Sequence, residues 1–192
     1  MNEYMAMINV IYNPARYCDE SWINPPAATD QEAVENFSRL PAYVKNHFIL
    51  RESQSFSITE SEAEENPYIT FFITNWDKIN YAAYLIGLKL CSAQLINAPS
   101  YMQNLTNQER AFLCLPLPAP PSAAIISETP LNANSIRQAG ANFIHNVATA
   151  VLPDVILARL RLIFPDSYRY DNAIFQDLNT PISLLKWAFD YA

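Results

Sequence analysis

The apolar residues of this chain recur mostly at the spacing of amphipathic helices. Between residues 81 and 95 they follow one another at intervals of three and four, which places them on one side of a helix. The members of this stripe are Tyr81, Tyr84, Leu85, Leu88, Cys91 and Leu95. The pattern predicts a core helix with Leu85 at the centre of its buried side.

Capping signals predict two further helices. Thr106 to Glu109 has the form of a capping box, and Ser135 to Gln138 repeats that form. The second of these helices carries an apolar face of Ile136, Gly140, Phe143, Val147 and Val151 opposite a polar face of Gln138, Asn142, His145 and Thr149. The two faces predict a helix with one side in the core.

Prolines mark the remaining helices. Pro153 fits the first turn of a helix that Pro165 ends, because proline at a helix start has no N–H to leave unpaired. Thr180 as a cap and Pro181 at the first helical position open a final helix, which contains Trp187. These helices predict a mainly α protein, with residues 1–192 forming a single compact helical domain.

Residues 68–76 are the exception, because their Ile, Thr, Phe and Trp side chains have strand propensity. An isolated strand leaves its backbone groups unpaired, and no second alternating run offers it a partner. We therefore predict that residues 68–76 are helical.

Two segments interrupt the helical pattern. Residues 53–66 form an acidic polar loop in which Glu60, Glu62, Glu64 and Glu65 stand among Ser and Thr, and residues 116–121 form a proline-rich connector. The whole net charge of −7 arises in residues 1–74, because the rest of the chain has equal numbers of acids and bases. A solvated loop is the favoured interpretation of the acidic run, and a contact with a basic partner surface is the alternative.

Composition excludes several classes of function. The chain has only 2 glycines, too few for the glycine-rich loops that bind nucleotide phosphates. Its net charge of −7 has the wrong sign for a nucleic-acid partner. No apolar segment has the length of a membrane span, and the start lacks the pattern of a signal peptide, so we expect a cytosolic protein without membrane insertion. The 3 cysteines, odd in number and widely spaced, suggest reduced thiols.

No catalytic constellation is found in the sequence. His47 and His145 lack a second ligand at helical spacing and are predicted to be surface or helix-end residues. Cys91 and Cys114 stand among leucines and are predicted to be packing residues. We therefore expect no catalytic residue, no cofactor and no metal. An enzyme of another type would need a pocket of perturbed titratable groups, which the sequence does not supply.

The three tryptophans are candidates for core or interface. Trp76 and Trp187 stand within or beside helical stripes and are predicted to be buried, whereas Trp22 fits either place. Trp22 and the four glutamates of the acidic run are therefore the candidate partner-binding residues.

Several segments taken together resemble a known family. The start at residues 10–17, the stretch at 75–87 with a Trp followed by Ala-Tyr-Leu-Ile-Gly, the Phe-Pro break at 162–165 and the apolar end at 184–192 occur in the order seen in that family. The chain resembles the SctK (OrgA/MxiK-type) proteins of bacterial type III secretion systems. The matching positions, which are expected to be structural, are Pro14, Tyr17, Trp76, Tyr84, Leu85, Gly87 and Pro165.

The resemblance implies a largely helical, non-enzymatic protein of the cytoplasmic sorting platform. Its partners would be the SctQ-type pod protein and the cytosolic domain of the SctD-type inner-membrane ring protein, which would place it in the cytoplasm at the inner membrane. The alternative is a secretion chaperone or a regulatory protein-binding protein. Such chaperones are usually shorter, dimeric and built around a sheet.

Overall fold

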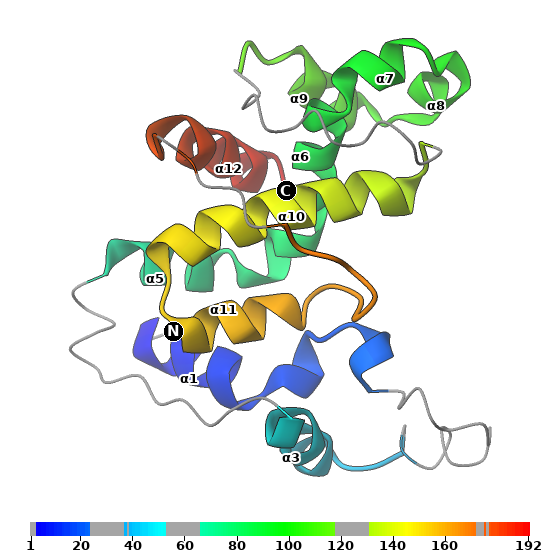
Figure 1. The fold of residues 1–192 in the computed structure, drawn as a ribbon. Helices are drawn as coiled ribbons and strands as arrows, with labels where there is room; N and C mark the ends of the chain where they lie inside the picture. The colour runs from blue at the N-terminus through cyan, green and yellow to red at the C-terminus, as the bar shows by residue number, and fades with distance from the viewer. Residues whose placement is uncertain are drawn as a thin grey trace. The chain divides into compact units, whose positions relative to one another are not determined.

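The computed structural model describes residues 3–23, 37, 39–52, 66–117, 131–171, 175 and 177–192 (Figure 1). These residues form helices and no strand, which confirms the predicted mainly α class. Residues 60–65 of the acidic run and 118–121 of the connector lie outside the described residues. The chain divides into two compact units, residues 1–77 with 151–168 and residues 78–150 with 169–192. The assignment of residues 1–192 to one domain stays a prediction.

Unit 1, residues 1–77 with 151–168, is built around its first helix. Its elements are α1 (Glu3–Tyr12), η1 (Pro14–Arg16), η2 (Glu20–Trp22), α3 (Ala42–Glu52), α5 (Pro67–Thr74) and α11 (Asp154–Arg161). α1 packs against α5, α11 and η1, and α3 packs against η1. The core between these elements contains Met7, Val10, Ile11, Ile69, Phe72, Ile156 and Leu160.

A buried arginine joins the two ends of unit 1. Arg159 on α11 is only 3% exposed, and its Nε donates to the carbonyl oxygen of Ile11 at 2.9 Å. Ile11 lies in the last turn of α1, where carbonyls lack partners within the helix and a cation is favourable. Burial lowers the pKa of the Arg159 guanidinium. The contact fixes the end of α1 on α11.

The segment with strand propensity is helical, as predicted. The side chain of Asn66 accepts a hydrogen bond from the backbone N–H of Tyr68 at 3.0 Å, and Pro67 occupies the first position of α5. This pairing of a cap with proline starts a helix whatever the propensity of the residues that follow. The buried side of α5 carries Ile69, Phe72 and Ile73.

Unit 2, residues 78–150 with 169–192, has α6 at its centre. Its elements are α6 (Ile79–Leu90), α7 (Ser92–Ile96), α8 (Pro99–Asn104), α9 (Asn107–Cys114), α10 (Ala133–Val151) and α12 (Asn179–Tyr191), with η3 (Trp76–Lys78) leading into α6. α6 packs against α12 and α9, α12 also contacts α9, and α7 contacts α8. The predicted helix over 81–95 is present as α6 and α7, which meet at Cys91.

Both glycines of the chain lie where α6 and α10 cross. A Cβ on Gly87 would overlap the carbonyl oxygen of Ile136, and a Cβ on Gly140 would overlap that of Ala83. Neither glycine has a positive φ, so their role here is to leave space. The two helices therefore meet backbone to backbone, which only residues without a side chain allow.

The capping box at α9 is confirmed. Thr106 Oγ1 accepts from the backbone N–H of Glu109 at 3.2 Å, and the Glu109 carboxylate accepts from the backbone N–H of Thr106 at 2.6 Å. The box predicted at Ser135 is wrong, because α10 begins earlier, at Ala133. Ser135 instead exchanges hydrogen bonds with Asn132, whose side chain accepts from the Ser135 N–H at 2.8 Å. Asparagine caps as well as serine does, and this earlier cap adds three residues, 133–135, to the helix.

The final helix differs from its prediction in two ways. α12 begins at Asn179, so Thr180 lies inside the helix and is not its cap. Asp177 accepts the Asn179 N–H at 3.1 Å and supports this start. Trp187 was predicted to be buried and is 44% exposed, because the buried side of α12 passes through Leu184, Leu185 and Ala188. An apolar residue beside a stripe is therefore not always part of it.

Two further positions differ from the sequence predictions. His145 was expected at a surface or helix end, but it is 3% exposed within α10 and stacks on Tyr170 with ring centroids 4.3 Å apart. Cys114 was predicted to pack and is exposed, because α9 ends there and turns its last residue outward. Cys91 is buried and His47 is exposed, as predicted.

Candidate functional site

The positions that carry the family resemblance in unit 1 hold its interior together. Pro14 is buried, and the Tyr17 hydroxyl donates to the carbonyl oxygen of Val10 at 2.7 Å. The ring of Tyr17 meets Trp76 edge to face with centroids 5.4 Å apart, and Trp76 is 7% exposed, as predicted. Burial raises the pKa of Tyr17 well above its usual range, so the hydroxyl stays protonated as a donor. These contacts are packing contacts within unit 1.

Trp22 and Pro165 lie near each other in unit 1. The indole N–H of Trp22 donates to the carbonyl oxygen of Phe164 at 2.7 Å, which leaves 37% of the residue exposed. Pro165 follows Phe164 and is half-buried. Trp22 thus has its polar end fixed inside the protein and part of its ring at the surface. It remains a candidate contact residue with a structural role as well.

The corresponding positions in unit 2 also make contacts between helices. Leu85 is fully buried, and Gly87 gives α6 its close crossing with α10. The hydroxyls of Tyr84 and Tyr101 are 3.0 Å apart and share a hydrogen bond between α6 and α8. Burial raises the pKa of Tyr84. The remaining surface of the two units is therefore where partner contacts must be sought.

Among the described residues no group of three His, Cys, Asp or Glu side chains is placed to hold a metal ion. Within the same ranges, no helix combines the length and the apolar character that crossing a membrane requires. The glutamates of the acidic run lie outside these ranges, so their assignment as partner-binding residues stays a prediction.

A buried asparagine fixes α3 on unit 1. Asn46 is 6% exposed, and its Oδ1 accepts from the backbone N–H of Ala15 at 2.8 Å. Its Nδ2 donates to Asn13 Oδ1 at 3.0 Å. Ile49 is buried on the same side of the helix. Two directional bonds from one side chain set both the position and the rotation of α3 on η1.

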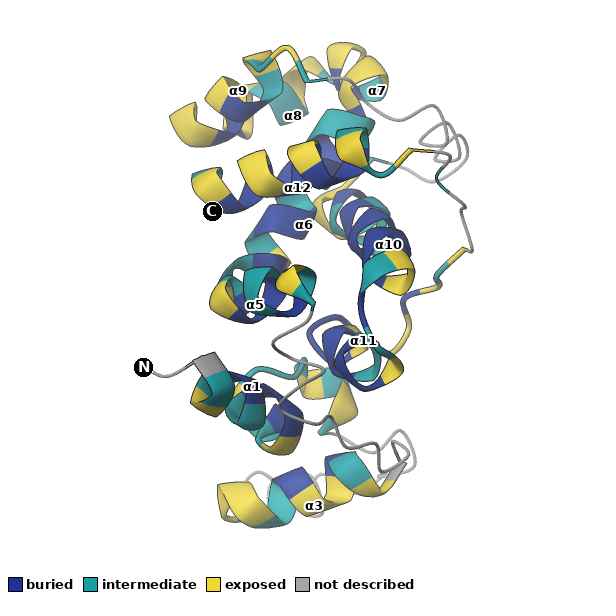
Figure 2. Ribbon diagram, turned by 90° about the vertical axis from the view of Figure 1, so that its left-hand side faces the viewer, coloured by how far each residue is buried: buried dark blue, intermediate teal, exposed yellow. Residues whose placement is uncertain are grey.

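The opposite side of α3 is exposed and partly aromatic. Tyr43 is 75% exposed and Phe48 is 46% exposed, and His47 and Arg51 are exposed beside them. We call these four residues the α3 outer face. In Figure 2 most of the exposed part of α3 lies along its lower edge, away from α1. Large exposed aromatics of this kind are enriched at protein interfaces.

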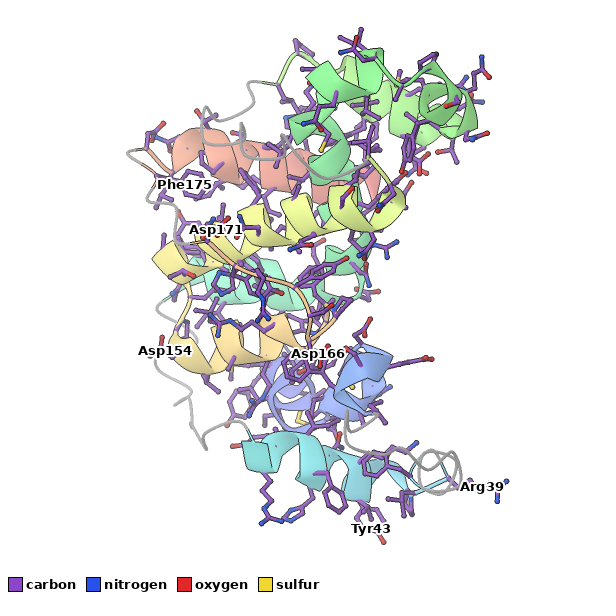
Figure 3. All side chains as sticks on the ribbon, turned by 45° about the vertical axis from the view of Figure 1, so that its right-hand side comes forward. Arg39, Tyr43, Asp154, Asp166, Asp171 and Phe175 are labelled. Carbon is purple, nitrogen blue, oxygen red and sulfur yellow. The ribbon has the colours of Figure 1, made fainter. Side chains whose placement is uncertain are left out.

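The charge around α3 is opposite to that of the chain as a whole. The four bases of residues 1–74 are Arg16, Arg39, Lys45 and Arg51. Three of them fall within residues 39–52, where Glu52 is the single acid, although the protein carries a net charge of −7. Figure 3 shows Tyr43 pointing away from α1, with Arg39 beside the start of α3. The α3 outer face is therefore an aromatic surface with basic neighbours.

Replacing Asn46 with alanine should test whether this anchor holds α3. The change leaves the Ala15 N–H without its acceptor, which should lower the free energy of unfolding by about 1–3 kcal/mol. Urea unfolding of the full chain measures the loss. His47→Ala on the exposed side is the matched control and should stay within about 0.5 kcal/mol of the original protein. Equal stability of the two variants would show that other contacts fix α3.

Unit 2 has an exposed aromatic surface of its own on α12. Trp187 is 44% exposed, and Ser183, Lys186 and Asp190 are exposed at neighbouring positions on the same side. One cation and one anion accompany the ring, so this surface has no marked charge. Neither surface was predicted from the sequence. The signal for the first was present in residues 39–51, which contain three of the four bases of the acidic first third of the chain.

Comparison with known proteins finds a match to a protein family. A family model described as bacterial type III secretion apparatus protein (OrgA_MxiK) matches residues 7–192. No curated protein and no solved structure matches the chain. The matched range includes almost every element of both units.

Proposed function

The chain belongs to the OrgA/MxiK family of bacterial type III secretion apparatus proteins, and from this membership we propose that it is a non-enzymatic adaptor of such an apparatus. Its place would be the cytoplasmic sorting platform, peripheral to the inner membrane. There it would link the cytosolic domain of the SctD-type ring protein to the SctQ-type pod protein. The observation that carries the proposal is the family match over residues 7–192.

The exposed aromatic residues support an adaptor role. An adaptor needs at least two surfaces for protein partners, and aromatic and arginine side chains supply most of the binding energy at such surfaces. Unit 1 carries the α3 outer face, with Tyr43 and Phe48, and unit 2 carries Trp187 on α12. The two surfaces also differ in charge, which suits partners of different chemistry.

The residues that resemble the family pattern support a role without catalysis. Tyr17, Trp76 and Leu85 are engaged in packing, and Gly87 lies at a helix crossing. A catalytic group has to reach a substrate, and Trp76, Leu85 and Gly87 are buried. The family is one of secretion apparatus proteins, and we assign no reaction to this chain.

Deletion of the gene should abolish type III secretion and leave the membrane rings assembled. An adaptor between ring and pods acts after the rings have formed, so secreted proteins should be absent from the culture supernatant while rings remain visible by electron microscopy of isolated membranes. Supplying the original gene on a plasmid is the control and should restore secretion. Normal secretion by the deletion strain would refute the adaptor role.

Affinity capture separates an adaptor from a secretion chaperone. A tagged full-length chain should retain the pod protein and the ring protein from wild-type cells. In cells without the ring protein it should still retain the pod protein, whereas a chaperone would retain secreted cargo in both strains. Recovery of cargo without either apparatus protein would favour the chaperone.

A further inference from the structure

The α3 outer face combines two properties that select a partner. It exposes the aromatic rings of Tyr43 and Phe48, and it carries Arg51 in a stretch, residues 39–52, that contains three bases and the single acid Glu52. We propose that this face binds a carboxylate-rich surface of another protein of the secretion apparatus. This inference rests on the proposed function and assigns one of the adaptor's contacts to four residues of α3.

The aromatic rings provide the apolar part of the contact. Tyr43 is 75% exposed, so nearly the whole side chain is available to a partner. The ring of Phe48 is half-exposed and is supported from one side by Phe37, with the ring centroids 5.4 Å apart. A supported ring loses little freedom when it is covered, which lowers the entropic cost of binding.

The basic residues determine which partner is accepted. A guanidinium forms two parallel hydrogen bonds with a carboxylate, and a positive patch attracts an acidic surface during encounter. Arg51 is exposed on the same face as Tyr43 and His47, because the three residues are four positions apart on the helix. A basic partner would be repelled by the same residues.

The anchor of α3 makes this surface rigid. The two hydrogen bonds of Asn46 hold the helix on η1, and Ile49 is buried beneath it. A partner therefore meets side chains that already have a fixed spacing. This preorganisation favours specific recognition of a protein surface.

An anionic membrane is the other surface that a basic and aromatic helix can bind. Polybasic segments that bind such membranes contain clusters of about four to eight cations. Residues 39–51 contain only three cations, Arg39, Lys45 and Arg51, and the protein as a whole has a net charge of −7. The small positive charge and the negative total favour an acidic protein surface over a membrane.

The test measures binding of the full chain to the two proposed partners. The purified chain is titrated with the cytosolic domain of the ring protein and, separately, with the pod protein of the same system, at low and at physiological salt. The variants are Tyr43→Ala, Arg51→Gln and Arg51→Glu. Ile96→Ala and Arg169→Glu are the matched controls, because Ile96 is 78% exposed and Arg169 is an exposed cation, both in unit 2.

Tyr43→Ala should weaken binding to one of the two partners by about 30-fold, the effect of removing an interface hot spot. Arg51→Gln should weaken the same interaction by about 10-fold at low salt, and Arg51→Glu by more. The effects of both Arg51 variants should shrink at physiological salt, where charges are screened beyond ~8 Å. The two controls should bind within about twofold of the original protein, and thermal melts should show that all variants remain folded.

Two outcomes would overturn the inference. One is unchanged affinity of Tyr43→Ala and Arg51→Glu for both partners. Another is binding of the original chain to vesicles of anionic lipid that Arg51→Glu abolishes, with protein binding unaffected. Neither outcome changes what is expected of secretion in the deletion strain. The adaptor role is therefore tested separately.

Discussion

Gly140→Ala is expected to destabilise the protein, although the same change in most helices is stabilising. Alanine is normally the better helix residue by about 0.5–1 kcal/mol. At the crossing of α6 and α10 the new methyl group would overlap the carbonyl oxygen of Ala83. Because the obstacle is backbone, one helix has to move, and we expect a loss of about 3 kcal/mol or more, the upper end for overpacking. A total stability of about 5–15 kcal/mol makes this a large part of the whole.

Urea unfolding followed by circular dichroism measures the effect of Gly140→Ala. Gly87→Ala should give a similar loss, because its methyl group would overlap the carbonyl oxygen of Ile136. Ser183→Ala on the exposed side of α12 is the control and should change stability by less than about 0.5 kcal/mol. A stabilised Gly140→Ala variant would show that α6 and α10 are farther apart than described here.

Leu85→Ala should cost about 2–5 kcal/mol, the usual range for removing a buried leucine side chain. Leu85 is fully buried in α6, the helix that packs against both α12 and α9. The cavity left behind would lie at the centre of unit 2, so its walls have little freedom to collapse. Thermal and urea unfolding of the full chain should both detect the loss.

Ile96→Ala is the matched control for Leu85→Ala, because Ile96 is an aliphatic residue that is 78% exposed. Its replacement should leave the free energy of unfolding within about 0.5 kcal/mol of the original value. Similar losses in the two variants would mean that burial does not explain the effect at Leu85.

The helices were predictable because their signals are local. The stripe around Leu85 and the capping box at Thr106 each involve residues within a few turns of one another, and both are confirmed. The helix over residues 68–76 was predicted by elimination, but Asn66 followed by Pro67, where α5 begins, would have been a direct signal. Errors arose where a neighbour competed for the same role, as Asn132 does with Ser135.

Burial was harder to predict, because it depends on which elements meet. His145 lies on the face of α10 that looks polar in the sequence, yet Tyr170 covers it. Trp187 is apolar and exposed, because nothing among the described residues of unit 2 covers that side of α12. The sequence also indicates that glycines are rare here, but not that both lie at one crossing.

The candidate surface on α3 illustrates the same limit. The basic character of residues 39–52 could have been read from the chain, because they contain three bases and one acid. Which side of α3 faces outward depends on Asn46 and its two bonds to η1. Those bonds join residues 31 and 33 positions apart, a separation at which local patterns carry no information.

The division of the chain into units has a consequence for its synthesis on the ribosome. Residues 151–168 belong to unit 1 but follow most of unit 2 in the sequence. The bond from Arg159 to Ile11 spans 148 positions, so the end of α1 must wait until nearly the whole chain has been made. Domains usually fold in order as they are synthesised, with the N-terminal part first. Here unit 1 cannot be completed before unit 2 is largely translated. A chain whose synthesis ends before residue 159 would lack the buried partner of its first helix.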